Sequence, residues 1–359
     1  MNYKTAGESH GQGILALIED FPAGIVIDQE SINAELQRRQ GGYGRGGRQK
    51  LEQDTAEILT GIWRGKSTGA PISLWIKNRD SRIDAAPDVF QPRPGHADLA
   101  GSIKYDEPIR PILERSSARE TAGRVAAGAL AKQYLETRGV KVAGFVKNIG
   151  DFLPESIADF DYAAIIERRQ QSVFYTAYPE HDDKLKTEID RLAADGDTIG
   201  GIIEVRVFGV PIGLGSCMQW NAKLDGKLAQ AVMSIQAIKG VEIGLGFAAA
   251  HTPGSQMHDP IGYDVALESS PSQGFTRATN NAGGIEGGMS NGQPIIIRCA
   301  MKPIPTLKTP LASIDLRTKE SAPTFYERSD VCAVPAGSVV VENIVAMTIA
   351  CEMAACEKV

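Results

Sequence analysis

The clearest periodic pattern in the chain lies between Glu114 and Gly139. Apolar residues recur there at helical spacing and form one stripe of mostly small side chains: Ala122, Val125, Ala126, Ala129, Leu130 and Tyr134. The segment Ser117–Glu120 before the stripe matches a Ser-x-x-Glu capping box, and Gly139 after it is a typical stop signal. The pattern predicts one capped helix whose Ala- and Gly-rich face packs closely against a neighbour.

Shorter patterns predict the other elements. Alternating or branched apolar residues predict strands at Ile14–Glu19, Ile58–Trp63, Pro71–Lys77, Val140–Asn148, Ile202–Phe208 and Ile295–Met301. Helical spacing predicts helices at Glu30–Arg39, Ser156–Gln170, Glu180–Asp195, Leu224–Ile238 and Val339–Glu357. The proline-rich stretch from Asn78 to Glu114 is predicted to be a long functional loop. Because strands and helices alternate without regular βαβ spacing, we expect an α+β fold with antiparallel sheet. No linker interrupts the chain, so one domain is expected over residues 1–359.

Composition and charge exclude several classes of protein. The five cysteines are scattered without a CxxC pair, which argues against a disulfide framework and against a structural metal site. The net charge of −6 disfavours nucleic acid or a membrane surface as a partner. No apolar run approaches transmembrane length and the N-terminus lacks a signal-peptide core, so a cytoplasmic protein is expected.

Cationic and glycine-rich stretches are the candidates for chemistry. Two arginines, Arg115 and Arg119, flank the hydroxyls of Ser116 and Ser117 at the start of the predicted helix, where the helix dipole also favours an anion. A well-capped core helix would show the same cap without any ligand. Two arginines within the cap favour a functional site.

Three further arginines, Arg39, Arg45 and Arg48, lie in or beside the glycine-rich segment 41–47. A solvated loop is the ordinary explanation of such a segment, and a bound polyanion would account for both the charge and the glycines. The segment also resembles an RGG motif, but it occurs once, in an acidic chain without neighbouring stacking aromatics. RNA binding is therefore the weaker interpretation.

Two histidines lie in turns that a ligand could approach. His10 lies in GESHGQG, where glycines flank it closely, and His96 follows Arg93 by three residues in RPGHAD. Either could equally be a surface histidine in a turn. The segment 244–249 formally fits GxGxxA, but it runs into His-Thr-Pro-Gly instead of a helix, so it is not a dinucleotide fingerprint.

Together these stretches resemble the chorismate synthase family. The matching motifs run in the family's order from end to end of the chain: GESHGQG with FPAG, RRQGGYGRGGRQ, RPGHADL, RSSARET, GDTIGG, SIQAIKGVEIG, NNAGGIEGGMSNGQ, KPIPT and ERSDVCAVPA. One departure is Asp20, where the family pattern leads us to expect glycine.

The resemblance implies a fold and a reaction. It implies a β-α-β sandwich with helices between two antiparallel sheets, assembled as a homotetramer, for which the small-residue C-terminal helix is a candidate interface. It implies 1,4-anti elimination of phosphate from 5-enolpyruvylshikimate 3-phosphate to give chorismate. The reaction needs reduced FMN (FMNH2) but has no net redox change. NADPH enters only as a reductant of the flavin, as in members that regenerate their own reduced FMN.

The resemblance also implies roles for residues. His10 resembles the acid that protonates the leaving phosphate, His96 the residue that protonates the reduced flavin, and Asp330 the group that helps to deprotonate it. The residues implied to bind the substrate are Ser9, Arg39, Arg45, Arg48, Arg93, Arg119 and Arg328. Those implied to bind the cofactor are Arg115, Ser116, Ser117, Gln236, Ala237, Gly287, Lys302, Pro303, Ile304, Pro305, Thr306 and Arg328. The glycines at 283, 284, 287 and 288 would let the backbone approach a flat ring.

Two other functions fit the same residues. A flavin reductase would consume NAD(P)H steadily without the phosphorylated substrate. An anion-binding module would bind arbitrary RNA in a salt-sensitive way and show no affinity for FMN.

Overall fold

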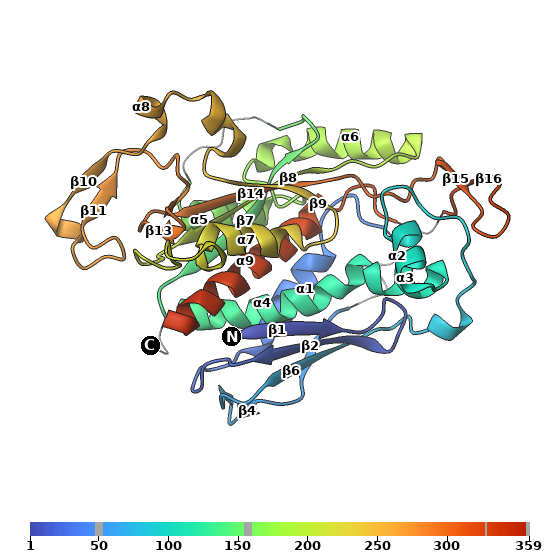
Figure 1. Cartoon of the computed structure of the whole chain (residues 1–359), viewed down its shortest axis with the longest axis horizontal. Coiled ribbons are helices and arrows are strands. Elements are labelled where there is room, and N and C mark those ends of the chain that lie inside the picture. The colour runs from blue at the N-terminus through green and yellow to red at the C-terminus, as the bar shows by residue number, and fades with distance from the viewer. Residues whose placement is uncertain (47–52, 154–159, 327–328, 357–359) are drawn as a thin grey trace.

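Two four-stranded antiparallel sheets enclose a layer of helices (Figure 1). The computed structural model describes residues 1–46, 53–153, 160–326 and 329–356. The first sheet has the order β1 (Asn2–Ala6), β2 (Gly13–Glu19), β6 (Ile72–Lys77) and β3 (Ala56–Ile58). The second has the order β7 (Lys141–Ile149), β8 (Gly201–Phe208), β14 (Ile295–Met301) and β9 (Ile238–Ile243). The predicted α+β sandwich is confirmed.

Hydrophobic alternation sets the register of the first sheet. Ile72, Leu74 and Ile76 are buried while their neighbours in β6 are more exposed. In the antiparallel pairing with β2, these three residues lie opposite Ile18, Ala16 and Ile14, which are also buried. A slip of one residue would turn this apolar set to the opposite face, so the alternation specifies one pairing.

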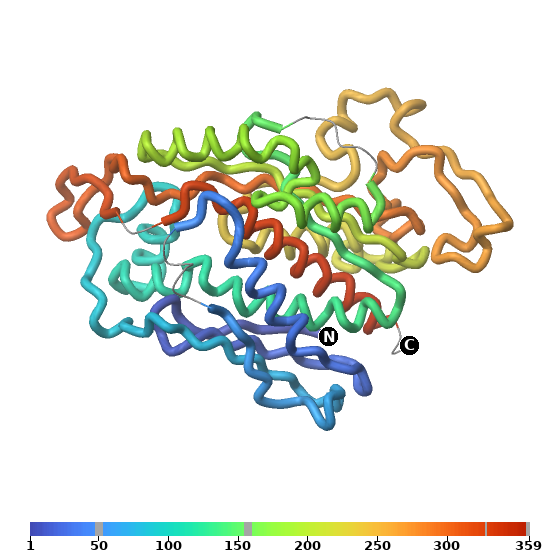
Figure 2. Tube along the Cα trace, turned by 180° about the vertical axis from the view of Figure 1, so that it is seen from behind, coloured from blue at the N-terminus to red at the C-terminus, as the bar shows by residue number. Residues whose placement is uncertain are grey.

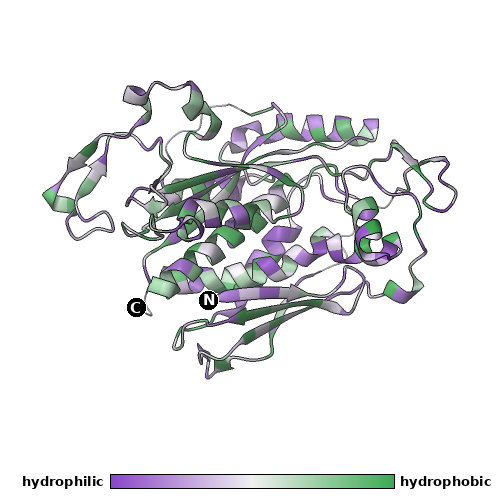
Figure 3. Cartoon of the chain, in the orientation of Figure 1, coloured by the Kyte–Doolittle hydropathy of each residue, from purple (hydrophilic) through white to green (hydrophobic). Residues whose placement is uncertain are grey.

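The layer between the sheets is built from the central helices. They are α1 (Gln29–Gln40), α4 (Thr121–Glu136), α7 (Leu224–Met233) and α9 (Val334–Cys356). Helix α9 contacts the other three and also β7 and β8, and the view from behind shows it crossing the middle of the protein (Figure 2). Helix α6 (Asp182–Asp195), at the top of Figure 3, carries both hydrophobic and hydrophilic residues. Helix α5 (Tyr162–Gln171) contacts β7.

The C-terminal helix corrects two expectations. By length and composition α9 could cross a membrane, because an 18-residue window within it has a mean hydropathy of 1.7. The expectation that no apolar run approaches transmembrane length is therefore wrong. However, 67% of that window is buried inside the protein, as in the core helix of a soluble protein. The small-residue positions Ala346, Ala350 and Ala354 are also buried within the chain, so they offer no surface for a tetramer.

The predicted helix from Glu114 to Gly139 is interrupted. Helix α3 (Ile109–Ser116) is followed by Ser117, whose backbone is extended, and a 3-10 turn at Ala118–Glu120 precedes α4. The Ser117 hydroxyl accepts from the Arg119 amide, not from that of Glu120, so the predicted capping box does not form. Helix α4 ends at Glu136, before the predicted stop at Gly139.

Other boundaries differ from the predictions for local reasons. The predicted strand Ile58–Trp63 is split by Gly61, whose φ of 85° is in the left-handed region, into β3 and β4 (Ile62–Trp63). The predicted loop from Asn78 to Glu114 contains α2 (Asp98–Tyr105) as well as α3. The predicted helix ending at Ile238 stops at Met233.

Asp20, where the family pattern has glycine, has a left-handed φ of 57°, which explains why glycine is expected at this position.

The remaining elements are short hairpins and turns at the periphery. The hairpins are β4 with β5 (Lys66–Ser67), β10 (Ile261–Tyr263) with β11 (Phe275–Arg277), β12 (Ile285–Glu286) with β13 (Met289–Ser290), and β15 (Ala312–Ile314) with β16 (Ser321–Pro323). Helix α8 (Gly254–Met257) is a single turn. The longer 3-10 segment is η6 (Gly246–His251), and single turns lie at Ile83–Ala85, Pro179–His181, Trp220–Ala222 (η5) and Val265–Leu267.

Candidate functional site

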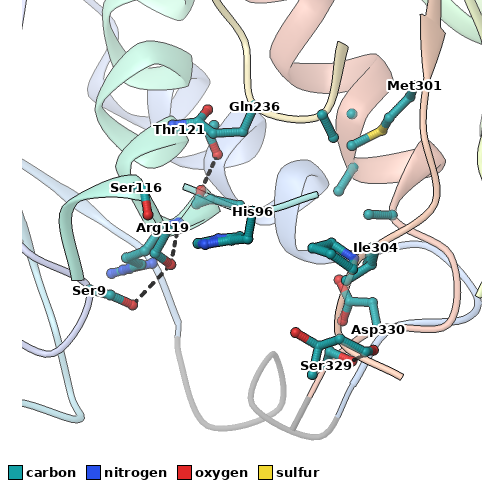
Figure 4. A pocket seen from close by; sticks show the side chains of 18 of the residues that line it. Ser9, His96, Ser116, Arg119, Thr121, Gln236, Met301, Ile304, Ser329 and Asp330 are labelled. Atoms are coloured by element: carbon teal, nitrogen blue, oxygen red, sulfur yellow. Dashed lines mark hydrogen bonds between the residues drawn. The ribbon is translucent and has the colours of Figure 1, made fainter. Parts of the chain in front are cut away.

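A cavity of about 440 Å³ opens between the two halves of the sandwich. Its walls come from the β1–β2 loop, the end of α1, the α3–α4 junction, the Arg93–Asp98 turn, the end of β14 and the start of α9. Figure 4 shows Ser9, Ser116 and Arg119 on one side, Ile304, Ser329 and Asp330 on the other, and His96 between them. This volume is in the range of small-molecule sites.

His10 lies in the β1–β2 loop and is held by a buried acid. Its Nδ1 is 3.0 Å from both carboxylate oxygens of Glu114, and its backbone amide donates to the same carboxylate at 2.8 Å. Burial alone would raise the pKa of Glu114, but the hydrogen bond from His10 and the charge of that residue outweigh it and hold the pKa below its ordinary value. Nδ1 is therefore occupied, and Nε2 is the ring nitrogen left for the cavity.

Two buried guanidiniums share one carboxylate in the next part of the wall. Asp54 accepts from Arg39 Nη2 at 2.7 Å and from Arg119 Nη1 at 2.7 Å. The two arginines hold the pKa of Asp54 below its ordinary value although burial opposes this. Arg119 Nε also donates to Asn78 Oδ1 at 2.8 Å, and Asn78 donates to three carbonyls of the His10 loop. Arg39, Arg119 and the loop that carries His10 are thus joined in one hydrogen-bond network.

The RPGHAD segment forms the predicted turn. The His96 amide donates to the Arg93 carbonyl, and Asp98 binds both side chains, at 2.8 Å to Arg93 Nε and 2.5 Å to His96 Nδ1. These bonds hold the pKa of the buried Asp98 far below its ordinary value, against the effect of burial. Arg93 Nη1 donates to Thr306 Oγ1 at 3.0 Å, which links this turn to the KPIPT segment.

Asp330 precedes α9 and fixes the glycine- and arginine-rich loop. Its carboxylate lies 2.9 Å from Arg45 Nη1 and accepts from the Gly46 amide at 2.6 Å. Both residues line the cavity. Residues far apart in the sequence therefore place a cation and a carboxylate together at one wall.

The cavity has more cationic than anionic side chains in its lining. Arg39, Arg45, Arg93, Arg119 and Lys302 face it, and Asp330 is the one carboxylate among the described lining residues. Within the part of the chain that the structure describes, Arg39 Nε, Arg45 Nε and Arg119 Nη2 are buried and have no hydrogen-bond partner in the protein. Buried donors are normally paired, so these atoms indicate that the wall is built to meet an anion.

One end of the cavity is apolar. It is lined by Ile235, Ala237, Met301, Ala333, Ala336, Gly337 and Val340. At Gly337 an added Cβ would lie 2.7 Å from Met301 Sδ, so alanine there would require the Met301 side chain at the end of β14 to move. Beside this end, Gln236 Oε1 is a buried acceptor that no described residue bonds. Lys302 donates to the Gly95 carbonyl, and burial together with Lys239 lowers its pKa.

Most of the predicted site residues meet at this cavity. Those that line it are Ser9, His10, Arg39, Arg45, Arg93, His96, Ser116, Ser117, Arg119, Gln236, Ala237, Lys302, Ile304, Pro305, Thr306 and Asp330. Arg48 and Arg328 lie outside the described residues.

Three predicted cofactor residues do not line the cavity. Arg115 turns away and donates to the carbonyls of Thr5 and Gly7, and Pro303 and Gly287 are also absent from the lining. Gly283 and Gly284 pack against the backbone of Gly244, Pro294 and Ile295. In this chain their close approach is to protein backbone.

Sequence reasoning missed the buried partners of the site. Asp54, Asn78, Asp98 and Glu114 were not singled out, although Asp98 lies within RPGHADL and Glu114 immediately precedes RSSARET. For Asp98 and Glu114, their position within or beside the motifs RPGHADL and RSSARET is the available signal. Burial of an acid beside an arginine from another element cannot be read from local sequence.

Comparisons with known proteins agree on one family. The chorismate synthase family model matches residues 1–354. A chorismate synthase of Aquifex aeolicus is 50% identical over 370 residues, covering 98% of this chain and 92% of that protein. One of Geobacter sulfurreducens is 51% identical over 364 residues, with the same coverage. A crystal structure of chorismate synthase superposes with a TM-score of 0.79 at 43% identity, covering 97% of this chain and 90% of the other.

Proposed function

The chain belongs to the chorismate synthase family, and we propose that it eliminates phosphate from 5-enolpyruvylshikimate 3-phosphate to give chorismate, with reduced FMN as cofactor. Family membership makes it a lyase of aromatic amino-acid biosynthesis. The observation that best supports the specific reaction is the excess of guanidiniums in the cavity, four against a single lining carboxylate among the described residues. The proposed substrate carries two carboxylates and a phosphate, which match that excess.

Substrate binding falls to the guanidiniums. Arg39 and Arg119 are held by Asp54, Arg93 by Asp98, and Arg45 by Asp330. Because each side chain is already fixed, little rotamer entropy is lost when the anion binds. Arg119 Nη2 is one buried donor that a substrate oxygen would satisfy.

The proton for the leaving phosphate comes from His10 in this proposal. Its Nδ1 is bound to Glu114, so Nε2 is the nitrogen that can donate to a phosphate oxygen as the carbon–oxygen bond breaks. His96 is fixed through Nδ1 by Asp98 and lines the same cavity, where it can exchange a proton. Asp330, on the wall opposite Ser9 and Arg119, offers a carboxylate that can accept a proton.

The residues present fit FMN. The apolar end offers a surface for a flat ring, and Gln236 Oε1, which no described residue bonds, offers an acceptor for a ring N–H. The residues that would hold the group are Ser116, Ser117, Gln236, Ala237, Lys302, Ile304, Pro305 and Thr306. When bound, reduced FMN supplies an electron transiently to the substrate, which eases loss of phosphate where the departing hydrogen is not acidic. NADPH belongs to the proposal only as a reductant of the flavin.

An anaerobic assay tests this proposal. Purified protein, 5-enolpyruvylshikimate 3-phosphate and reduced FMN should release inorganic phosphate over many turnovers, and oxidised FMN should support none. Folded protein that binds reduced FMN but releases no phosphate would overturn the proposal. Steady NADPH oxidation without substrate would indicate a flavin reductase, and salt-sensitive RNA binding without FMN affinity would indicate an anion-binding module.

A further inference from the structure

Glu114 binds the β1–β2 loop, which carries His10, through both its side chain and its main chain. Its side chain is fully buried at the last turn of α3. Both carboxylate oxygens lie 3.0 Å from His10 Nδ1, and one accepts the His10 backbone amide. The main-chain carbonyl of Glu114 accepts the amide of Ser9 at 3.0 Å. One residue therefore binds the ring and the backbone of the loop together.

The other described residues near this loop bind backbone groups or Glu114, and not the imidazole. Asn78 Nδ2 donates to the carbonyls of Glu8, Ser9 and Gly11, so it fixes the backbone path but does not touch the ring. Arg110, one turn before Glu114 on α3, has its Nη1 3.6 Å from Glu114 Oε1, and its Nε donates to the Pro87 carbonyl. Among the described residues, only Glu114 has a recorded hydrogen bond to the imidazole.

We propose that Glu114 is a positioning residue that keeps a hydrogen on His10 Nδ1 and directs Nε2 at the cavity. This inference rests on the proposed function, in which His10 is the acid. An ionised carboxylate only accepts hydrogen bonds, so a ring nitrogen 3.0 Å from both of its oxygens must carry the hydrogen. The lowered pKa of Glu114 supports the ionised form.

This arrangement determines where each proton lies during the step. The imidazolium gives its Nε2 proton to a phosphate oxygen as the carbon–oxygen bond breaks with its electron pair going to the phosphate. His10 is then neutral with its remaining hydrogen on Nδ1, still bound to Glu114, which stays ionised. Solvent returns the proton to Nε2 after phosphate leaves. Without Glu114 the neutral ring could carry its hydrogen on either nitrogen, and no carboxylate would hold Nδ1 so that Nε2 faces the cavity.

The tautomer can be measured directly in the wild-type protein. The chain has five histidines, so ring-15N labelling gives few signals, and a His10→Asn variant identifies those of His10. We expect His10 Nδ1 to be protonated and strongly hydrogen-bonded at every pH at which the protein is folded and Glu114 is ionised. An unprotonated Nδ1 at neutral pH would overturn the proposal, and this result needs no variant at Glu114.

Matched variants separate positioning from structure. Glu114→Gln should keep its melting temperature within several degrees and its KM within about threefold. It should lose roughly tenfold to a hundredfold in kcat, part of the contribution of a general acid. Glu8→Gln is the control, because Glu8 is an exposed acid two residues from His10 with no recorded bond to the ring. It should retain kcat within about twofold.

The conservative variant supplies the decisive comparison. Glu114→Asp keeps the carboxylate, so it should retain the Nδ1–H signal of His10 and recover much of the kcat that Glu114→Gln loses. Folded Glu114→Gln with the kcat of Glu8→Gln would overturn the proposal. If wild-type protein releases no phosphate but shows the Nδ1–H signal, the proposed reaction fails while the positioning of His10 stands.

Discussion

Each described arginine of the cavity is held by a carboxylate that is buried or nearly so. Asp54 forms ion pairs with Arg39 and Arg119, Asp98 with Arg93, and Asp330 with Arg45. This pairing allows strongly cationic side chains to be buried before a ligand arrives. It also fixes their direction, so the site is preorganised for an anion.

The paired carboxylates predict how stability depends on pH. The folded-state pKa of Asp54 and of Asp98 is lowered, so their ionised forms stabilise the fold fully above the ordinary aspartate value of about 4. That stabilisation is lost as the pH falls through the lowered values, because the unfolded chain then binds more protons. The free energy of unfolding, measured by urea titration from pH 7 to pH 3, should fall as the pH falls below about 4.

Asp54→Asn should lower the free energy of unfolding by roughly 3–5 kcal/mol at pH 7 and make it depend less on pH in the acid range. Parallel curves for the variant and the wild type would contradict this account.

Asp330 gives a residue-scale prediction about turnover. Asp330→Asn retains an oxygen that can accept from the Gly46 amide, so the loop and the ligand affinities should change only a few-fold. Turnover should fall by about a hundredfold or more, as expected for loss of an acid–base group. Binding is measured by fluorescence titration with FMN and turnover by phosphate release. Full activity of the purified variant would remove Asp330 from the mechanism.

At the scale of elements, α4 and α9 approach closely at one glycine. A Cβ on Gly128 would lie 2.3 Å from the Asn343 carbonyl oxygen, so Gly128→Ala must force the helices apart. We expect a loss of about 1–3 kcal/mol in the free energy of unfolding. Gly226→Ala is the matched control, because Gly226 lies exposed within α7 with open space around it. Alanine there should stabilise the protein by roughly 0.5–1 kcal/mol. Equal effects at the two positions would contradict the packing argument.

The elements that sequence predicted well are those with strong periodicity. Strand β14 was predicted closely from its run of branched apolar residues, and β6 from its alternation, because burial on one face leaves a period of two. Helix α3 was missed because Pro108 and Pro111 suggested a loop, although Pro108 is its N-cap and Pro111 lies in its first turn, where no amide is needed.

The cations and histidines of the site could be predicted from sequence, but their buried partners could not. Motifs identified the cations and histidines, since these cluster with glycine in short segments. Asp54 binds Arg119 across 65 positions in sequence, and Asn78 lies 41 positions from the same arginine. Such pairs depend on how the sheet and helices pack, which local pattern does not contain.

At the scale of the whole molecule, charge and apolar surface are distributed unevenly. The chain has a net charge of −6, yet its cavity gathers four described arginines. This contrast concentrates anions at the site and not over the general surface.

Exposed apolar side chains suggest that copies of the chain associate, and we propose the homotetramer that the family resemblance implies. Met218, Trp220, Phe247, Ile261 and Val265 are each more than 65% exposed, on or beside η5, η6 and the β10–β11 hairpin. The hairpin projects from the body at one end (Figure 1). Because exposed Trp, Phe and Met side chains are typical of interaction surfaces, we expect further copies of the chain to cover them. Sedimentation velocity should show a tetramer that Trp220→Ser with Phe247→Ser shifts toward smaller species. Trp63→Ser on the distant β4 should leave it unchanged, and a wild-type monomer at micromolar concentration would contradict the proposal.

If phosphate is eliminated without net redox change, the flavin must end the reaction in the oxidation state in which it began. Protein, substrate and reduced FMN are mixed without oxygen, with substrate in large excess over flavin, while phosphate and flavin absorbance are recorded together. Loss of phosphate and a proton leaves the carbon skeleton at the same overall oxidation level. The account therefore predicts many phosphates released per flavin, with the flavin still reduced at the end. Oxidation of one flavin for each phosphate released would contradict it.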